Sequence, residues 1–486
     1  MKTSQTNNEN SEQEISLCFN DIYGYEYKTK EKIQEGGQGA VFLASEKGIA
    51  LKLAFGENKR FLDKNTLSEK EIAEKNKEFL RLILLPLPPN TNITLPVSVF
   101  KDAVGYTMRL MEDMTSFEKR FMAERSDTSK SNYTNDWLEE TFSDSKDIKS
   151  QFADYIYSGG ARGRLHAYYL YSCVIAKIHS QGLVYCDISD NNVFITENEH
   201  DFEKDHVWLI DADNLNYQSE ALKTSYYTPG YGAPEVCSGK GASFNSDCYA
   251  FAVSLFWSLV MNHPFKGTAY ENYDGTLNEA DEMLENGDFD FVLDENGENI
   301  IMGIYQPICE NVLSDGLKNV FMRMFTTGKF DIRKRPSMME ISDAIADSLD
   351  NSLMCSACGM PYRNDEEKCQ CFWCGSINNV LSINAYSAEE RNCGSFNREI
   401  AENNTINIPS RIIRGNDVFN TDNMLMSVKL SDTGMDIVAL NNDILLYISE
   451  NKQRIYGSYE LDKRKVSLLA HDTKCDKEYC LEVEIL

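Results

Sequence analysis

Two residues five positions apart, Asp187 and Asn192, are the clearest candidates for chemistry in this sequence. They come shortly after the apolar run 183–185, which reads as a short buried strand. A carboxylate placed there can accept the proton of an attacking hydroxyl, and an amide oxygen can coordinate a metal ion. Taken alone, the segment is equally compatible with an ordinary Asp/Asn turn.

Asp211 is a second candidate, because it ends the apolar run 207–210. A carboxylate at the end of a buried strand is costly unless it meets a cation. Mg²⁺ together with nucleotide phosphates would supply that cation. The sequence therefore makes Asp211, like Asn192, a candidate magnesium ligand.

A glycine-rich segment and a lysine form the third candidate. Gly36, Gly37 and Gly39 lie between two strand-like runs, where glycine lets the backbone approach phosphates closely. Lys52 follows about a dozen residues later, flanked by apolar residues. A plain turn and a surface lysine are the simpler interpretations of each signal alone. Their order fits a loop and a lysine that hold the phosphates of a nucleotide.

The segment 227–235 contains Thr228 and Glu235, and Arg335 follows Glu235 by a hundred residues. An ion pair between Glu235 and Arg335 would join distant parts of the chain. Because burying two charges is costly, such a pair is hard to explain unless it fixes the architecture.

Four cysteines form two Cys-x-x-Cys-Gly knuckles with 12 residues between them, namely Cys355, Cys358, Cys371 and Cys374. Four thiolates suit tetrahedral Zn²⁺, and a closed set of four is structural rather than catalytic. Free or redox-active cysteines are the alternative, and Cys369 is a substitute ligand with poorer spacing. The acidic residues 365–367 favour contact with protein over nucleic acid.

Short strands and one helix must position the glycines and Lys52. Strand-like pieces alternate over 19–53, and a helical pattern covers 68–85 before a cluster of prolines. Further strand-like runs cover 93–100 and 104–111.

The following part of the chain reads as mostly helical up to about residue 350. A polar insertion over 125–160 precedes a long helix over 162–181, which Gly182 closes. Strand-like runs at 183–185, 193–196 and 207–210 follow, and later an acidic, loop-rich stretch at 266–300.

The last hundred residues alternate short strands with Asn, Asp and Gly turns, which indicates an all-β module resembling a sandwich. Its turns are loosely similar to those of forkhead-associated phosphopeptide domains, in which case Arg411 or Arg414 would face a phosphate. A plain β interaction module is the simpler interpretation. The domains expected are a disordered tail at 1–18, an α+β domain at 19–350, a zinc ribbon at 353–378 and the β module at 380–486.

Composition and charge argue against nucleic-acid binding, membrane insertion and secretion. The chain has 486 residues, with 48 Lys and Arg against 76 Asp and Glu, a net charge of −28. Because nucleic-acid binding rests on cationic side chains, this balance argues against a nucleic-acid partner. The longest apolar run, Tyr249–Met261, is too short to span a membrane, and residues 1–16 lack the apolar core of a signal peptide. We therefore expect a cytoplasmic protein with reduced cysteines.

In order and spacing, these motifs resemble the protein kinase superfamily, of the Ser/Thr type, over residues 20–350. The resemblance implies a bilobal domain, with an N-lobe at about 19–111 and a C-lobe at about 112–350. It also implies ATP- and Mg²⁺-dependent transfer of the γ-phosphate to protein hydroxyls. Asp187 would then be the catalytic base, and Lys52 would contact the nucleotide phosphates.

The same resemblance implies roles for further residues. Asn192 and Asp211 would hold Mg²⁺, and Glu78 would pair with Lys52 because apolar Leu82 follows it by four positions. Thr228 would lie in the loop that receives the substrate hydroxyl. The residues expected around the nucleotide are Gly36, Gly37, Gly39 and Val41 over its phosphates and Met108, Arg109 and Met111 beside its adenine.

Several positions depart from the family pattern. Tyr185 and Cys186 replace the usual His-Arg pair, so we expect activation that does not depend on phosphorylation of the loop. Ser189 replaces a common lysine, and Asp213 stands where a glycine is usual. These departures leave two alternatives open, a nucleotide-binding pseudokinase scaffold and a small-molecule phosphotransferase on the same fold.

Two segments, 263–267 and 319–328, are similar to those of a bacterial kinase group of stress and tellurite-resistance systems. The resemblance implies a PP2C-type phosphatase and a von Willebrand A-type protein as partners.

Overall fold

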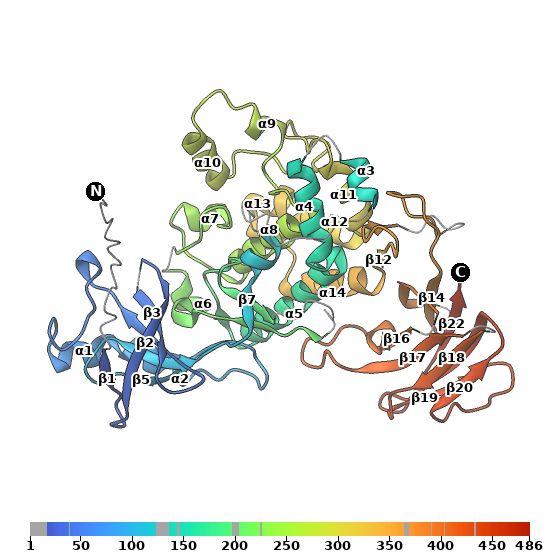
Figure 1. Ribbon diagram of the computed structural model, residues 1–486, viewed down its shortest axis with the longest axis horizontal. Coiled ribbons are helices and arrows are strands. Elements are labelled where there is room, and N and C mark those ends of the chain that lie inside the picture. The colour runs from blue at the N-terminus through green and yellow to red at the C-terminus, as the bar shows by residue number, and fades with distance from the viewer. Residues whose placement is uncertain are drawn as a thin grey trace, which may run out of the picture. The chain divides into compact units, whose positions relative to one another are not determined.

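A computed structural model describes residues 17–37, 39–122, 136–142, 146–196, 204–223, 226–363, 369–389, 391–402, 404–431 and 434–486 (Figure 1). The tail expected at 1–18 falls almost wholly outside these residues, as do Gln38 and the acidic residues 365–367. The chain forms two compact units. Among the described residues, the small unit holds those up to Leu87 together with 92–114 and 209–213, and the large unit holds the others.

The small unit is built on a six-stranded sheet in the order β1-β2-β3-β4-β6-β5. Its elements are β1 (Cys18–Asn20), β2 (Glu26–Glu35), β3 (Gly39–Ala44), β4 (Ile49–Ala54), α1 (Glu69–Lys75), α2 (Lys77–Ile83), β5 (Pro96–Val99) and β6 (Gly105–Arg109). Phe19, Leu51, Leu53 and Phe100 are buried in one apolar cluster, because alternate residues of a strand share a face.

The helix expected over 68–85 is interrupted at Asn76, which separates α1 from α2. The buried amide of Asn76 donates to the carbonyls of Phe100 and Ala103 and accepts from the amide of Gly105. A side chain that satisfies three backbone groups of the neighbouring loop ties the helix pair to the sheet.

The large unit begins with a helical lobe. Its helices are α3 (Asp136–Thr141), α4 (Lys146–Tyr157), α5 (Gly160–Ser180), α6 (Gln218–Ala221), α7 (Pro234–Cys237), α8 (Phe244–Val260), α9 (Thr268–Glu271), α10 (Leu277–Asn286), α11 (Tyr305–Val312), α12 (Asp315–Met322), α13 (Gly328–Phe330) and α14 (Met338–Asp350). Short strands accompany them, namely β7 (Met114–Ser116), β8 (Leu183–Val184), β9 (Val193–Thr196), β10 (Val207–Leu209) and β11 (Asn216–Tyr217).

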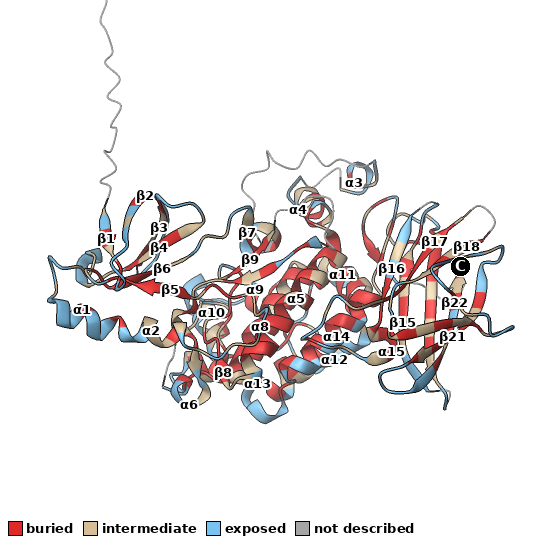
Figure 2. Ribbon diagram, turned by 90° about the horizontal axis from the view of Figure 1, so that it is seen from below, coloured by how far each residue is buried: buried red, intermediate tan, exposed pale blue. Residues whose placement is uncertain are grey.

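Helices α5 and α8 form the core of this lobe and are buried over most of their length (Figure 2). Apolar residues lie on all sides of α8, as expected for a helix that is surrounded by protein. Ser243 and Ser246 form a reciprocal cap that fixes its first turn. Among the described helices, none has the length and apolarity needed to cross a bilayer.

The cysteine segment and the β module complete the large unit. Their elements are β12 (Leu353–Met354), β13 (Pro361–Tyr362), β14 (Val380–Ser387), β15 (Asn392–Glu399), β16 (Thr405–Pro409), α15 (Arg411–Arg414), β17 (Met424–Leu430), β18 (Met435–Ala439), β19 (Ile444–Ile448), β20 (Ser458–Leu461), β21 (Lys465–Asp472) and β22 (Lys477–Ile485). A five-stranded sheet, β15-β14-β22-β21-β19, and a four-stranded sheet, β16-β17-β18-β20, share one apolar core. This arrangement is a sandwich.

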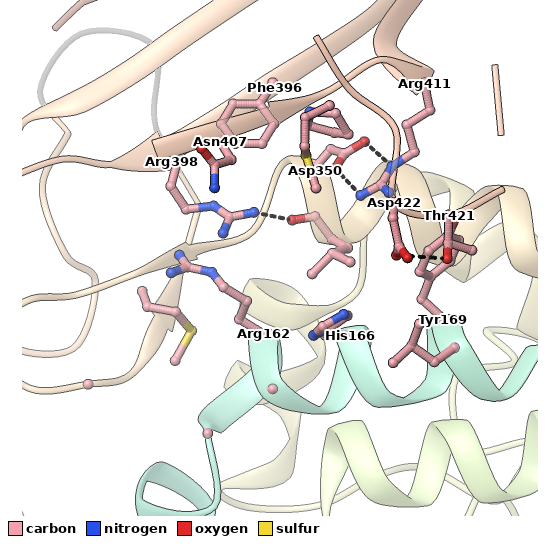
Figure 3. Close-up of a pocket in the computed structure, with 18 of the residues that line it drawn as sticks. Arg162, His166, Tyr169, Asp350, Phe396, Arg398, Asn407, Arg411, Thr421 and Asp422 are labelled. Carbon is pink, nitrogen blue, oxygen red and sulfur yellow. Dashed lines mark hydrogen bonds and ion pairs between the residues drawn. The ribbon is translucent and has the colours of Figure 1, made fainter. Parts of the chain in front are cut away.

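Arginine pairs join the β module to the helical lobe. Arg411 makes two hydrogen bonds to Asp350 at the end of α14, at 2.7 and 2.5 Å (Figure 3). Arg162 of α5 bonds both carboxylate oxygens of Glu399, at 2.6 and 2.5 Å. A cavity of about 460 Å³ lies between α5 and the module, lined by His166, Arg398 and others.

The structure contradicts the phosphate-binding role considered for the two arginines of α15. Arg411 is engaged by Asp350, and Arg414 makes two hydrogen bonds to Asp472, at 2.6 and 2.7 Å. Both guanidinium groups thus serve the packing of the module, since their planar forks are matched by carboxylates of the same chain.

Candidate catalytic site

Lys52 lies at the centre of the small unit's sheet. In the strand register, Lys52 of β4 is opposite Val41 of β3 and Tyr106 of β6. Its ammonium Nζ lies 2.5 Å from Oδ1 of Asp211 and 2.7 Å from Oδ2 of Asp213. Burial lowers the pKa of Lys52, but the charges of Asp213 and Asp211 outweigh burial and raise it. The lysine is therefore held in its charged form.

The structure does not bring Glu78 to Lys52. Glu78 is on α2 with its side chain 77% exposed, and its carboxylate lies 3.5 Å from the guanidinium of Arg81. Leu82, four residues later, is buried as expected. The helix therefore faces the core as the sequence indicates, but the partners of Lys52 come from the segment 211–213.

The glycine-rich turn joins β2 and β3. Gly36 and Gly37 are exposed, and a Cβ atom at either would meet nothing within 4 Å. A Cβ atom at Gly39 would lie 2.3 Å from the carbonyl oxygen of Leu53, so only glycine fits there. Gly39 thus permits the close pairing of β3 and β4 that places Val41 opposite Lys52.

The predicted adenine segment begins on β6. Met108 is half-buried and opposite Ala50, and Arg109 is exposed at the end of the strand. Met111 is half-buried two residues beyond the strand. Contact of these residues with a nucleotide base stays a prediction.

Asp187 lies in the large unit between two donors. The hydroxyl of Thr228 donates to its Oδ1 at 3.0 Å, and Nδ2 of Asn192 donates to its Oδ2 at 3.1 Å. The same Nδ2 donates to the carbonyl of Asp187 at 3.0 Å. Since Asn192 donates through nitrogen, its amide oxygen is the atom with which it would bind a cation.

Asp247 is a residue of this site to which the sequence analysis assigned no task. Its buried carboxylate on α8 accepts from the backbone amides of Tyr185 and Cys186, at 2.7 and 3.1 Å, and lies 3.0 Å from Nε2 of His179. Cys186 has a φ of 71°, a left-handed conformation that is uncommon outside glycine. Asp247 therefore holds a strained turn directly before Asp187. The sequence feature that could have identified Asp247 is its position as a charged residue in the strongly apolar helix α8.

Asp190 is a second such residue. It is 1% exposed and accepts from the hydroxyls of Ser254, Tyr168 and Tyr231, at 2.5, 3.1 and 3.1 Å. Burial raises its pKa to about 6, although the three hydrogen bonds oppose that rise. Asp190 thus connects the Asp187 loop with α5, α8 and the segment that carries Thr228.

The predicted ion pair between Glu235 and Arg335 is confirmed. Nη1 and Nη2 of Arg335 donate to the two carboxylate oxygens at 2.6 and 2.8 Å. The arginine side chain has no exposed surface. The pair joins α7 to the turn before α14, which fixes the segment that follows Thr228.

The four knuckle cysteines come together as the sequence predicts. Their Sγ atoms all lie within 4.8 Å of one another, and the Cys355–Cys374 and Cys358–Cys371 separations are 3.6 and 3.7 Å. Cys369 is outside this set. Four clustered thiols form a donor set that fits tetrahedral Zn²⁺.

Part of the chain is similar to a known family of domains. A family model described as the protein kinase domain matches residues 164–344, which include Asp187, Asn192 and Asp211. The serine/threonine-protein kinase YPK3 of Saccharomyces cerevisiae is 28% identical over 141 residues, which is 27% of this chain and 26% of that protein. The human protein kinase C delta type is 32% identical over 95 residues, which is 20% of this chain and 14% of that protein.

The serine/threonine-protein kinase polo of Drosophila melanogaster is 29% identical over 104 residues, covering 20% of this chain and 17% of its own length. The chain therefore spans about a quarter or less of these relatives. Residues 164–344 are therefore similar to a protein kinase domain, and the relatives named are serine/threonine kinases or protein kinase C.

Proposed function

We propose that this chain is an ATP- and Mg²⁺-dependent protein kinase that transfers the γ-phosphate to serine or threonine hydroxyls of protein substrates. The observation that carries the proposal is the carboxylate of Asp187, fixed between Asn192 and Thr228 within the segment that matches the kinase model. The geometry suits a base that orients a hydroxyl, and here the hydroxyl of Thr228 already donates to it.

Each residue has a defined task in this mechanism. Asp187 orients the attacking hydroxyl and accepts its proton, while Lys52 holds the phosphates in line for the displacement. Asn192 and Asp211 would hold Mg²⁺, which neutralises charge on the phosphates when bound. Asp247 keeps the turn before Asp187 in place, so that the base is oriented before substrate arrives.

The direct test is transfer of ³²P from labelled ATP to casein by the purified full chain. We expect Asp187→Asn to lower kcat by about 10³-fold while ATP binding persists, because loss of a positioned base removes transition-state stabilisation. Equal incorporation by wild type and Asp187→Asn would contradict the proposal. Tight ATP binding with no transfer by wild type would favour a pseudokinase scaffold instead.

We further propose that the cysteine cluster binds one Zn²⁺ and that its role is structural. All four thiols belong to one closed set, which leaves no position for a substrate or a catalytic water. No disulfide bond joins any of the 14 cysteines, which suits a cytoplasmic protein.

A role in bacterial stress signalling is the remaining part of the proposal. It is supported by the similarity of the segments 263–267 and 319–328 to a kinase group that works with a PP2C-type phosphatase and a von Willebrand A-type protein. The test is whether a purified PP2C-type phosphatase from the same organism removes phosphate from this chain. Failure of such phosphatases would argue against this placement.

A further inference from the structure

The ammonium of Lys52 is shared by two carboxylates that differ in their surroundings. The side chain of Asp213 is 14% exposed, whereas that of Asp211 is 36% exposed. The side chain of Lys52 itself is 13% exposed. The contact with Asp213 is therefore the better shielded of the two, and shielding strengthens an ion pair.

Asp213 is held on its other side as well. Its Oδ2 contacts Lys52, and its Oδ1 accepts from the hydroxyl of Tyr106 at 2.7 Å. Tyr106 is 2% exposed, and its ring packs edge-on against Phe79, with 4.8 Å between the centroids. Because Tyr106 is directly opposite Lys52 across β4 and β6, the strand register itself supplies both groups that hold Asp213.

The backbone brings both carboxylates to one ammonium. Asp211 has a φ of 55°, a left-handed conformation, and the short turn 212–214 follows it. Ala212, between the two aspartates, is 1% exposed. Ala212 is thus buried in the core, while Asp211 and Asp213 on either side of it both reach Lys52.

We propose that Asp213 is the positioning residue for Lys52 and holds its ammonium toward the nucleotide phosphates, a task usually given to a glutamate on the helix that corresponds to α1 and α2. The inference rests on the proposed function. In that function Asp211 is required by Mg²⁺, so Lys52 needs a second carboxylate that stays in place. Glu78, exposed and paired with Arg81, does not supply it.

The test compares Asp213→Asn with Glu78→Gln as the matched control, since both remove one negative charge at constant size. Binding of the non-hydrolysable analogue AMP-PNP with Mg²⁺ and binding of adenosine are measured by calorimetry. We expect Asp213→Asn to weaken AMP-PNP binding by about tenfold and leave adenosine unchanged, because Lys52 acts on phosphates alone. Glu78→Gln should change neither.

Two further variants separate positioning from folding. In a Lys52→Met background, Asp213→Asn should have no additional effect on AMP-PNP binding, because a residue that acts through Lys52 has nothing left to position. Asp213→Glu, which restores the charge, should regain part of the affinity. An additive loss in the double variant, or a loss in Glu78→Gln equal to that in Asp213→Asn, would overturn the inference.

The two proposals fail differently. If wild type binds no AMP-PNP, the proposed function fails. If wild type binds it and Asp213→Asn binds it equally well, the function stands and the role of Asp213 is excluded.

Discussion

At the scale of single residues, His263 shows how burial sets a protonation state beside Gly230, two residues after Thr228. Its imidazole is 2% exposed, with Nε2 lying 2.9 Å from the carbonyl of Gly230 and Nδ1 accepting from the amide of Phe265. One nitrogen accepts, so the other carries the proton and donates to Gly230, and the ring is neutral. Burial lowers the pKa of His263 to about 4.

This pKa predicts a pH dependence of stability. An unfolded histidine titrates near 6.5, so below that pH the unfolded chain takes up a proton that the folded chain refuses until about pH 4. The free energy of unfolding should therefore fall by about 3 kcal/mol as the pH drops from 6.5 to 4. Urea unfolding at several pH values measures this, with His263→Gln as the variant in which that part of the slope disappears. A slope equal to that of wild type would contradict it.

Local spacing was enough to group Asp187 with Asn192, but it did not identify the partners of Lys52. Asp187 and Asn192 are five residues apart, so one loop decides their geometry. Lys52 meets a segment about 160 residues away, and only the folded sheet decides which acid reaches it. The helix pattern correctly predicted that Leu82 is buried. It also predicted Glu78 as the partner of Lys52, which was wrong, because the carboxylate of Glu78 lies beside Arg81.

At the scale of elements, the two cysteine knuckles are where the sequence was most informative. Each Cys-x-x-Cys-Gly turn fixes its own geometry, since Gly359 and Gly375 both have a φ of 73°. Helix boundaries were less accessible: Asn76 divides α1 from α2 because distant backbone groups compete for its side chain. Local hydrophobic periodicity does not reveal such contacts between residues that are distant in the sequence.

The knuckles give a prediction on metal content. The purified chain should contain one Zn²⁺ per molecule, and Cys358→Ser should lose it together with several degrees of melting temperature, because a structural site contributes to folding. Cys369→Ser is the matched control, being a buried cysteine outside the set, and should retain the metal. Atomic emission spectrometry measures the zinc content, and thermal unfolding measures the melting temperature. Full zinc content in Cys358→Ser would rule out the closed site.

At the scale of the whole molecule, the β module and the helical lobe belong to one unit. Arg411 and Asp350 form a pair with little exposure, and the Arg411 guanidinium also covers the ring of Tyr169 at 4.9 Å. The sequence suggested an all-β module but gave no signal for this attachment, because the pairing acids lie in the helical lobe.

Breaking this pair should destabilise the large unit. Arg411→Gln leaves the carboxylate of Asp350 buried without its cation, at a cost of about 3 kcal/mol. Arg391→Gln is the control, since Arg391 is 80% exposed and its pair with Glu389 is on the surface. Urea unfolding should show a lower midpoint for Arg411→Gln alone. Equal midpoints for the two variants would contradict a stabilising role.

The grip of Asp247 on the turn before Asp187 has a consequence for how such chains diverge. Because the bonds go to main-chain amides, which every residue but proline provides, they make no demand on the side chains at positions 185 and 186. Tyr and Cys can therefore stand there without shifting the carboxylate of Asp187. Remote relatives should therefore be easier to recognise by an acidic residue inside an apolar helix, about sixty positions after the aspartate that corresponds to Asp187. The identities of the residues at positions 185 and 186 are a weaker guide.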